Sequence, residues 1–258
     1  MTELSGGDPN SGRPAVAPPI YPQPGYRAYP PSGYGGYPHP GLPTKSLRGL
    51  AIATQILLAI QLLAAIALLF PVLHERNLIE RIKSDPRSVT LAEAARADNT
   101  VNALNGLVLV LYIATGVVWI IWFYRARTNT DAWPSDYQRR RAGWAIGGWF
   151  CPIVNFWFPY MMAKDILDDT EADVNRGRAT RPLVVIWWLG FLALLVGALV
   201  QRGRGDAQTI DDFTGDATLN IVSVVIRILA IVPAFYVVRQ ITNAQSARVQ
   251  RDANRPAG

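Results

Sequence analysis

The chain has 258 residues, half of them hydrophobic and only 17% charged, with a formal net charge of +6. Its apolar residues gather in blocks of about 20, which excludes an ordinary soluble protein. Cys151 is the only cysteine, which excludes an intrachain disulfide, and His39 and His74 are too far apart to form a metal-binding motif. The basic residues stand mostly beside the apolar blocks, as membrane orientation requires, so we expect no nucleic-acid partner.

Residues 1–43 form a tail that is rich in proline, glycine and tyrosine and holds 11 of the 19 prolines. The tail has no aliphatic cluster that could start a core, so we expect it to be disordered, with polyproline-like character. One interpretation is a solvated spacer. The other is a docking or self-association segment that recruits protein partners.

Four apolar segments, at about 47–73, 101–124, 182–201 and 218–239, are each long enough to cross a bilayer as a helix. They predict an all-α integral membrane domain over residues 46–245, followed by a polar C-terminal tail over 246–258. The first helix should continue past the membrane and stop at Ser84. Thr90 and Glu93 have the spacing of a capping box, which predicts the start of the helix that leads into the second span.

The segment 143–163 contains GWFCPIVNFWFP, which is apolar enough for a bilayer but interrupted by Pro152 and Pro159. If it spans, the five-span arrangement leaves 11 Lys and Arg residues inside and 13 outside. If it returns to the side that it entered, the counts become 17 inside and 7 outside, as the positive-inside rule prefers. Proline also interrupts helices. We therefore predict four spans plus a proline-broken re-entrant or interfacial segment in the cell membrane, with both termini cytoplasmic; five spans is the alternative.

Two stretches, WFYRARTN (122–129) and GWAIGGWFCPIVNFWFPYMMAKDI (143–166), carry a family resemblance. They resemble the bacterial integral-membrane family catalogued as domain-of-unknown-function family 4328, which is common in actinobacteria. The resemblance covers roughly residues 46–245 and brings no assigned activity, so it supports the architecture alone. The matching positions are Trp122, Arg125, Asn129, Gly143, Trp144, Trp149, Phe150, Pro152, Asn155 and Pro159.

Arg227 is near the middle of the fourth predicted span, where an arginine is costly and needs a partner. No Asp or Glu lies within a predicted span, so the candidate partners are Asn155, carbonyls freed by Pro152 or Pro159, the faces of Trp187 or Trp188, or a bound anion. Asn155, between the two prolines, is either a turn residue or part of a pocket lining. The polar residues Gln61, Asn102, Asn105 and Thr115 are predicted to hydrogen-bond between helices.

Asp165, Asp168 and Asp169 share one helix face and could hold a divalent ion against a diphosphate, although a solvated acidic face has the same pattern. Arg139, Arg140 and Arg141 could contact anionic lipid headgroups, or they could serve orientation alone. No catalytic set, phosphate loop or zinc spacing is present, so we expect no catalytic residue, no cofactor and no metal ligand.

Three functional hypotheses follow from these features. The first is a non-enzymatic membrane scaffold whose tail recruits partners and which could form a homo-oligomer. The second is a small transporter or channel-like protein with a midplane site around Arg227 and Asn155. The third and least favoured is a Mg²⁺-dependent enzyme that acts on lipid-linked diphosphates through the Asp165 cluster.

Overall fold

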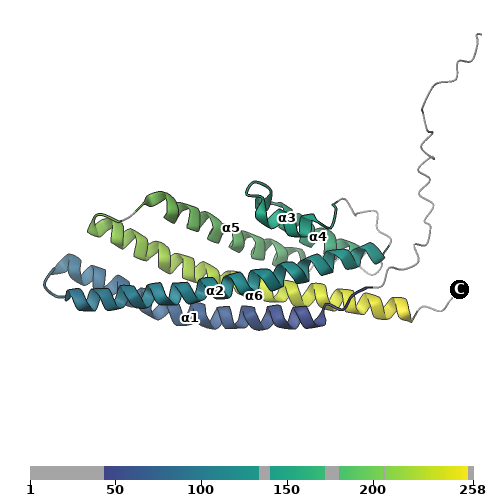
Figure 1. Cartoon of the computed structure of the whole chain (residues 1–258), viewed down its shortest axis with the longest axis horizontal. Coiled ribbons are helices and arrows are strands. Elements are labelled where there is room, and N and C mark those ends of the chain that lie inside the picture. Colours follow the sequence, from purple (N-terminus) through teal and green to yellow (C-terminus); the bar gives the residue numbers. More distant parts are fainter. Residues whose placement is uncertain (1–43, 134–139, 172–179, 206, 255–258) are drawn as a thin grey trace, which may run out of the picture. The chain divides into compact units, whose positions relative to one another are not determined.

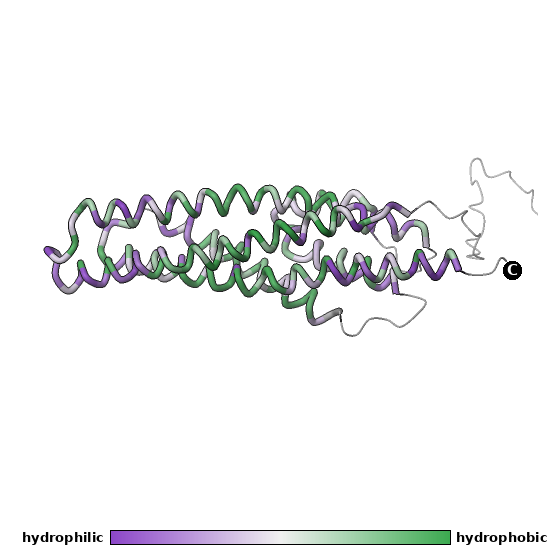
Figure 2. The backbone as a smooth tube through the Cα atoms, turned by 90° about the horizontal axis from the view of Figure 1, so that it is seen from below, coloured by the Kyte–Doolittle hydropathy of each residue, from purple (hydrophilic) through white to green (hydrophobic). Residues whose placement is uncertain are grey.

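The computed structural model describes residues 44–133, 140–171, 180–205 and 207–254, and the predicted tail over 1–43 lies outside them. Over the described residues the chain is helical and has no strands. Four helices are long and apolar enough to span a membrane: α1 (Arg48–Ser84), α2 (Leu91–Asn129), α5 (Thr180–Arg204) and α6 (Ile210–Ala253). Figure 2 shows hydrophobic residues along the middle of these helices and hydrophilic residues towards their ends. The prediction of an all-α membrane protein with four spans is confirmed.

The first helix shows how these segments satisfy both the bundle and the bilayer. Its buried positions include Thr54, Leu58 and Gln61, which recur at intervals of three or four residues and so share one face. Ile56 and Leu63, between them, are 55% and 68% exposed. Because lipid tails are as apolar as leucine, the outward face is apolar and polar side chains are kept for contacts between helices.

The loop between α1 and α2 follows the sequence prediction. Helix α1 ends at Ser84, and α2 begins after Thr90, whose side chain accepts a hydrogen bond from the Glu93 amide. Glu93 does not complete the capping box, because its carboxylate pairs with Arg81 at 3.1 Å instead. The start of α2 was therefore predicted correctly. Glu93 forms an ion pair between α2 and α1 instead of completing the cap.

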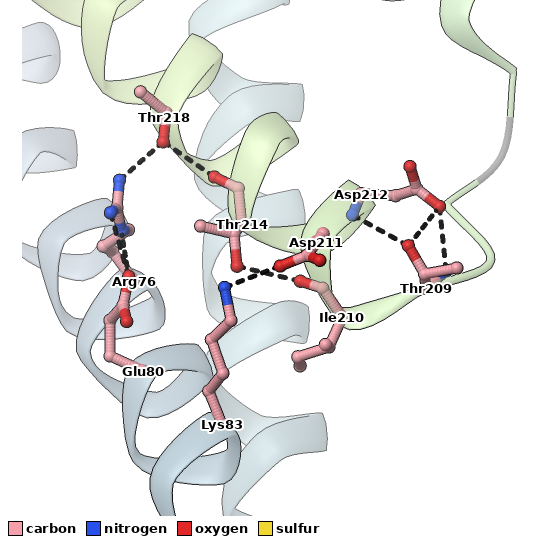
Figure 3. Close-up of polar contacts among 9 residues, drawn as sticks. All are labelled: Arg76, Glu80, Lys83, Thr209, Ile210, Asp211, Asp212, Thr214 and Thr218. Atoms are coloured by element: carbon pink, nitrogen blue, oxygen red, sulfur yellow. Dashed lines mark hydrogen bonds and ion pairs between the residues drawn. The ribbon is translucent and has the colours of Figure 1, made fainter.

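At the same end of the bundle, α6 begins with a complete capping box between Thr209 and Asp212. Figure 3 shows this cap beside the contacts that join α1 to α6, in which Lys83 pairs with Asp211 at 2.6 Å and Arg76 donates to Thr218. These side chains are exposed, so the contacts position the helix ends more than they stabilise them.

The proline-containing segment 143–163 does not form one long helix. It consists of α3 (Trp144–Phe150), a 3₁₀ turn (Val154–Phe156) and α4 (Phe158–Thr170). Pro152 lies in the break after α3, as predicted. Pro159 instead lies in the first turn of α4, where its missing N–H would have no helical partner in any case. It starts a helix, so the expectation that both prolines interrupt one was only half right.

This broken hairpin begins and ends at the same end of the bundle. The backbone carbonyl of Arg140, before α3, accepts a hydrogen bond from Arg127 near the end of α2. After the turn, the carbonyl of Asp169 at the end of α4 accepts a bond from Arg248 near the end of α6. Figure 1 places α3 and α4 together at this end. The five-span alternative is not supported, because no fifth helix in the described ranges is long and apolar enough to span.

The four long helices do not all pack against one another. The extensive interfaces join α1 to α2, α1 to α6, and α5 to α6, so the helices follow the order α2–α1–α6–α5. Helix α5 approaches α6 closely at Gly190, where an added Cβ would lie 2.7 Å from the Cβ of Ala230. Helix α5 ends at Arg204, followed by Gly205 with a φ of 73°. That left-handed conformation, common at helix C-termini, favours glycine.

Helix α6 extends beyond the predicted span at both ends. It starts at Ile210 and runs to Ala253, so residues 246–253, expected to belong to a polar tail, continue the helix. Within this extension Arg248 is 6% exposed and its guanidinium lies 4.9 Å from the ring centroid of Trp133. The polar composition of this part reflects contacts with α4 and with the end of α2 as well as contact with water.

Candidate functional site

The candidate site is built along one face of α6. Cavity-lining residues recur about once per helical turn along this face: Asp216, Asn220, Ser223, Arg227, Ala230 and Ala234, with Phe213, Ala217 and Ile231 beside them. The face therefore changes from polar to apolar at Arg227. A similar face of α2, which runs in the same direction as α6, passes from Asp98 and Asn102 to Thr115 and Trp119.

Two adjoining cavities lie along these faces. The outer cavity has a volume of about 960 Å³ and walls of mixed polar and apolar character, whereas the inner one has about 150 Å³ and is almost entirely apolar. Both are lined by residues of α2, α5 and α6, and they share Tyr112, Phe191, Leu194 and Arg227. Helix α2 packs against α1 and helix α5 packs against α6, but α2 and α5 have no extensive interface with each other. The cavities occupy the space that remains between them.

Arg227 stands at the junction of the two cavities, close to Tyr112, which lines both of them as well. Its Nη1 is buried and has no hydrogen-bond acceptor, and no ion pair or ring contact of Arg227 is found within the described part of the chain. The predicted partners Asn155, Trp187 and Trp188 therefore do not bind it. A buried guanidinium nitrogen without an acceptor is costly in a membrane, so water or an anion in the cavity is the candidate acceptor for Nη1.

The polar residues of α2 divide into one that bonds to α1, Thr115, and two that line a cavity, Asn102 and Asn105. Gln61 donates to Thr115 at 2.8 Å and to the carbonyl of Leu111 at 3.0 Å, so this pair joins α1 to α2 as predicted. Asn102 and Asn105 were expected to do the same, but they line the outer cavity instead and make no side-chain hydrogen bond to the residues described. Their amide groups are left available to a solvent or ligand.

The outer cavity also contains carboxylates. Glu75 of α1 and Asp98 of α2 line it, as does Asp216 of α6, which pairs with Arg204 at 3.1 Å. Arg227 is the only basic residue among the lining residues of this cavity. The positive charge is thus at the inner end of a compartment whose outer parts are neutral or acidic.

Aromatic rings form much of the wall of the inner cavity, which is partly open to its surroundings. Trp119 and Trp187 face each other across α2 and α5, with ring centroids 5.2 Å apart. Trp149, from the broken hairpin, lies 5.7 Å from Phe191 in an edge-to-face arrangement. Such packing is favourable for rings and leaves few polar atoms in the walls. The hairpin therefore supplies part of the end wall of the candidate site.

Comparison with known families matches residues 85–243 to the family described as Domain of unknown function (DUF4328). The chain belongs to the DUF4328 family. The match leaves out α1, although the resemblance seen in the sequence was expected to start near residue 46. No curated protein and no solved structure matches the chain.

Two of the DUF4328 motif residues lie in a buried polar cluster at the hairpin end. The Asn129 side chain pairs with the backbone of Lys45, accepting at 2.9 Å and donating at 2.8 Å, and it also donates to Gln245 at 3.0 Å. The Trp122 indole donates to Thr242 at 3.1 Å. These motif residues join α2 to α6 and to the chain before α1, so their observed role is structural.

Most of the remaining motif residues lie in the hairpin itself. Trp144 packs on Phe158, with centroids 4.9 Å apart. Phe150 is 72% exposed beside the break at Pro152. Gly143 precedes α3, and an added Cβ at this position would meet no atom within 4 Å. Arg125 lies in α2 instead, and its side chain donates to the carbonyl of Ser46 at 3.3 Å. None of these residues lines either cavity; Trp149 alone connects the motif to the candidate site.

Asn155 was expected to share a site with Arg227. Its backbone N–H donates to the Cys151 carbonyl at 2.8 Å, which supports the turn. Its side-chain oxygen is buried without a hydrogen-bond partner, and Asn155 lines neither of the two cavities. The carbonyl of Phe156, freed by the broken helix, accepts a bond from Trp188 at 3.3 Å. A tryptophan, not Asn155, thus satisfies that part of the turn.

The acidic cluster of α4 is occupied by protein contacts. Asp165 forms an ion pair with Arg140, and Asp169 is fully buried. Burial raises the pKa of Asp165 above its ordinary value, although the bond from Arg140 partly opposes the shift. In the described part of the chain no three His, Cys, Asp or Glu residues are grouped to hold a metal ion. Of the basic triplet, Arg140 also contacts the ring of Phe158, and Arg139 lies outside the described residues.

Several residues that build these sites were missed in the sequence. Arg127, Gln245 and Arg248 are buried and polar, but each lies in a stretch that reads as an ordinary charged flank. The cavity face of α2 did have a detectable signal, since Asp98, Asn102 and Asn105 recur at helical spacing on an otherwise apolar helix.

Proposed function

We propose that the membrane domain is a non-enzymatic, transporter- or channel-like protein that binds an anion at Arg227. The observation that carries the proposal is the buried Nη1 of Arg227, which has no hydrogen-bond acceptor and lies where a cavity of mixed polar and apolar walls meets an almost entirely apolar one. Intramembrane charged residues generally mark ligand or ion pathways. The anionic group is a phosphate or a carboxylate, because both present the oxygen acceptors that a guanidinium binds best.

The broken hairpin supports a transport role. In many transporters a discontinuous helix forms part of the midplane site and of the gate on one side. Here Trp149 of α3 contributes to the inner wall, while the outer cavity leads away from it between α2 and α5. In this proposal the hairpin is the closed inner gate, and the outer cavity is the open path.

The orientation follows from charge. We place the hairpin end, with both termini, in the cytoplasm of a cell-membrane protein, because the positive-inside rule favours the end with more Lys and Arg. Arg141, which is exposed, is then on the cytoplasmic side, where anionic lipids could contact it, whereas Arg140 is paired with Asp165. The outer cavity opens on the opposite side.

The scaffold hypothesis depends on the tail over residues 1–43, outside the described part of the chain, and stays a prediction. Its test is deletion of the tail: an unchanged set of co-purifying partners would reject it. Homo-oligomerisation is likewise a prediction, to be checked by the mass of the purified protein. The enzyme hypothesis also stays a prediction, and Asp165, on which it depended, is paired with Arg140.

Cysteine accessibility tests the anion site. Ser223 lines the outer cavity one turn from Arg227, and Cys151 can be removed as Cys151→Ser. In that background, Ser223→Cys should react with an impermeant anionic thiosulfonate reagent, and inorganic phosphate should slow the reaction. Arg227→Gln should remove the protection, while Arg227→Lys should keep part of it because the charge remains.

The control is the same labelling with a cationic reagent, whose rate should not fall in Arg227→Gln. Gel filtration of each variant checks that it folds. Absence of labelling from either aqueous side would contradict an aqueous cavity. Phosphate protection that survives in Arg227→Gln would contradict the assignment of Arg227.

A further inference from the structure

We infer that the ligand of this site carries a compact apolar group, of about benzene size, next to its anionic group. The inference rests on the proposed function and adds the chemical class of the ligand. It comes from the inner cavity, which the anion site alone does not explain. An anion without an apolar part would need only the outer cavity and Arg227.

The order of residues along the walls gives the orientation of the ligand. On α6, Asn220 and Ser223 precede Arg227, and Ala230 and Ala234 follow it. With the anionic group at Arg227, any further polar part of the ligand lies in the outer cavity. The apolar part then enters the inner cavity beyond Arg227.

The volume of the inner cavity limits the apolar part. It is about 150 Å³, and an engineered protein cavity of about 150 Å³ is known to bind benzene. A lipid acyl chain is much longer, so only part of it would lie within this space. A phenyl ring or a branched chain of about six carbons is the group that fits.

The walls of the inner cavity favour an aromatic or otherwise rigid apolar group. Trp119, Trp149 and Trp187 present ring surfaces from three different helices. Aromatic pairs in edge-to-face or offset geometry are favourable beyond simple burial. The ligand class is therefore an aryl or compact alkyl phosphate or carboxylate that reaches the site through the outer cavity.

Gly116 allows the inner cavity to be filled without disturbing its walls. It lines the cavity, and a Cβ added there meets no atom within 4 Å. Gly116→Leu should therefore occupy the space that the apolar group needs. Gly106→Leu is the matched control, because Gly106 is in the same helix, lines neither cavity and also has open space around an added Cβ.

The experiment is calorimetric titration of the full-length protein in lipid nanodiscs with inorganic phosphate, phenyl phosphate and decyl phosphate. The wild type and Gly106→Leu should bind phenyl phosphate at least about tenfold more tightly than inorganic phosphate, since burial of a ring of six carbons contributes more than one tenfold step. Gly116→Leu should bind inorganic phosphate as the wild type does but lose this advantage. Arg227→Gln should bind neither. Gly116→Ala, a smaller change, should lose part of the advantage and guards against misfolding of the leucine variant.

Three outcomes separate the possibilities. Equal affinity of the wild type for phenyl and inorganic phosphate overturns the inference and leaves the anion site standing. Affinity that rises further for decyl phosphate also overturns it and identifies a membrane lipid as the ligand. Failure of inorganic phosphate to bind the wild type overturns the proposed function and the inference together.

Discussion

The tight crossing of α5 and α6 makes a sharp prediction about Gly190. A Cβ at this position would lie 2.7 Å from the Cβ of Ala230 and 3.2 Å from its Cα. Carbon atoms in contact are normally about 3.5–4.0 Å apart, so the helices would have to separate by about 1 Å. Overpacking of this kind costs about 1–3 kcal/mol. Gly190→Ala should therefore destabilise the bundle, although alanine favours a helix by about 1 kcal/mol over glycine.

Gly197 provides the matched control on the same helix. Its added Cβ would meet only the Ser223 hydroxyl, at an ordinary 3.8 Å. Gly197→Ala has the same gain in helix propensity without the clash, so the difference between the two variants isolates the overpacking. The double variant Gly190→Ala, Ala230→Gly should recover most of the loss, because it removes the closest carbon.

The assay is thermal unfolding of the purified protein in detergent, followed by tryptophan fluorescence. A loss of 1 kcal/mol lowers the midpoint by about 2–4 °C for a domain of this size. Gly190→Ala should therefore melt several degrees below Gly197→Ala. Equal midpoints for the two variants, or no rescue in the double variant, would refute the close packing of α5 on α6.

Two further predictions concern the hairpin end. Asn129→Ala should lower the free energy of unfolding by about 1–3 kcal/mol, because the buried Gln245 side chain and the Lys45 backbone lose their partner; a denaturation midpoint equal to the wild type would contradict this role. Because burial raises the pKa of Asp165, its contribution to stability is present below the ordinary value of about 3.9 and is lost as pH rises through the folded-state pKa. In Asp165→Asn, the unfolding midpoint should no longer fall as the pH rises through the folded-state pKa of Asp165. If the midpoint of the variant depends on pH as that of the wild type does, Asp165 is not the group responsible.

The number of spans could be predicted because the bilayer imposes local requirements. A crossing helix needs about 20 apolar residues, and a proline within an apolar stretch leaves backbone groups unsatisfied. These rules identified the four long helices and the break at Pro152. They misjudged Pro159, because the effect of a proline depends on whether a helix starts or continues there, and that depends on the packing of α4.

The candidate site was only partly predictable. Arg227 was identified because a charge within an apolar span is conspicuous. Its pairing with Asn155 was a guess about distant segments, and the structure places Asn155 outside both cavities. Asn102 and Asn105 were assigned to contacts between helices because an amide in a span usually makes them. They line a cavity instead, since α2 has no extensive interface with α5.

The amino-acid sequence by itself determined that this is a four-span membrane protein with a broken hairpin and one costly arginine within a span. Each of these properties depends on residues that are neighbours along the chain. The tertiary structure alone decided that α2 and α5 stay apart, that Gly190 brings α5 onto α6, and that Arg227 faces the resulting cavities. The physical reason is that apolar helices offer lipid and one another nearly the same surface. The choice of partner therefore depends on the detailed fit of side chains far apart in sequence, as at Gly190 and Ala230.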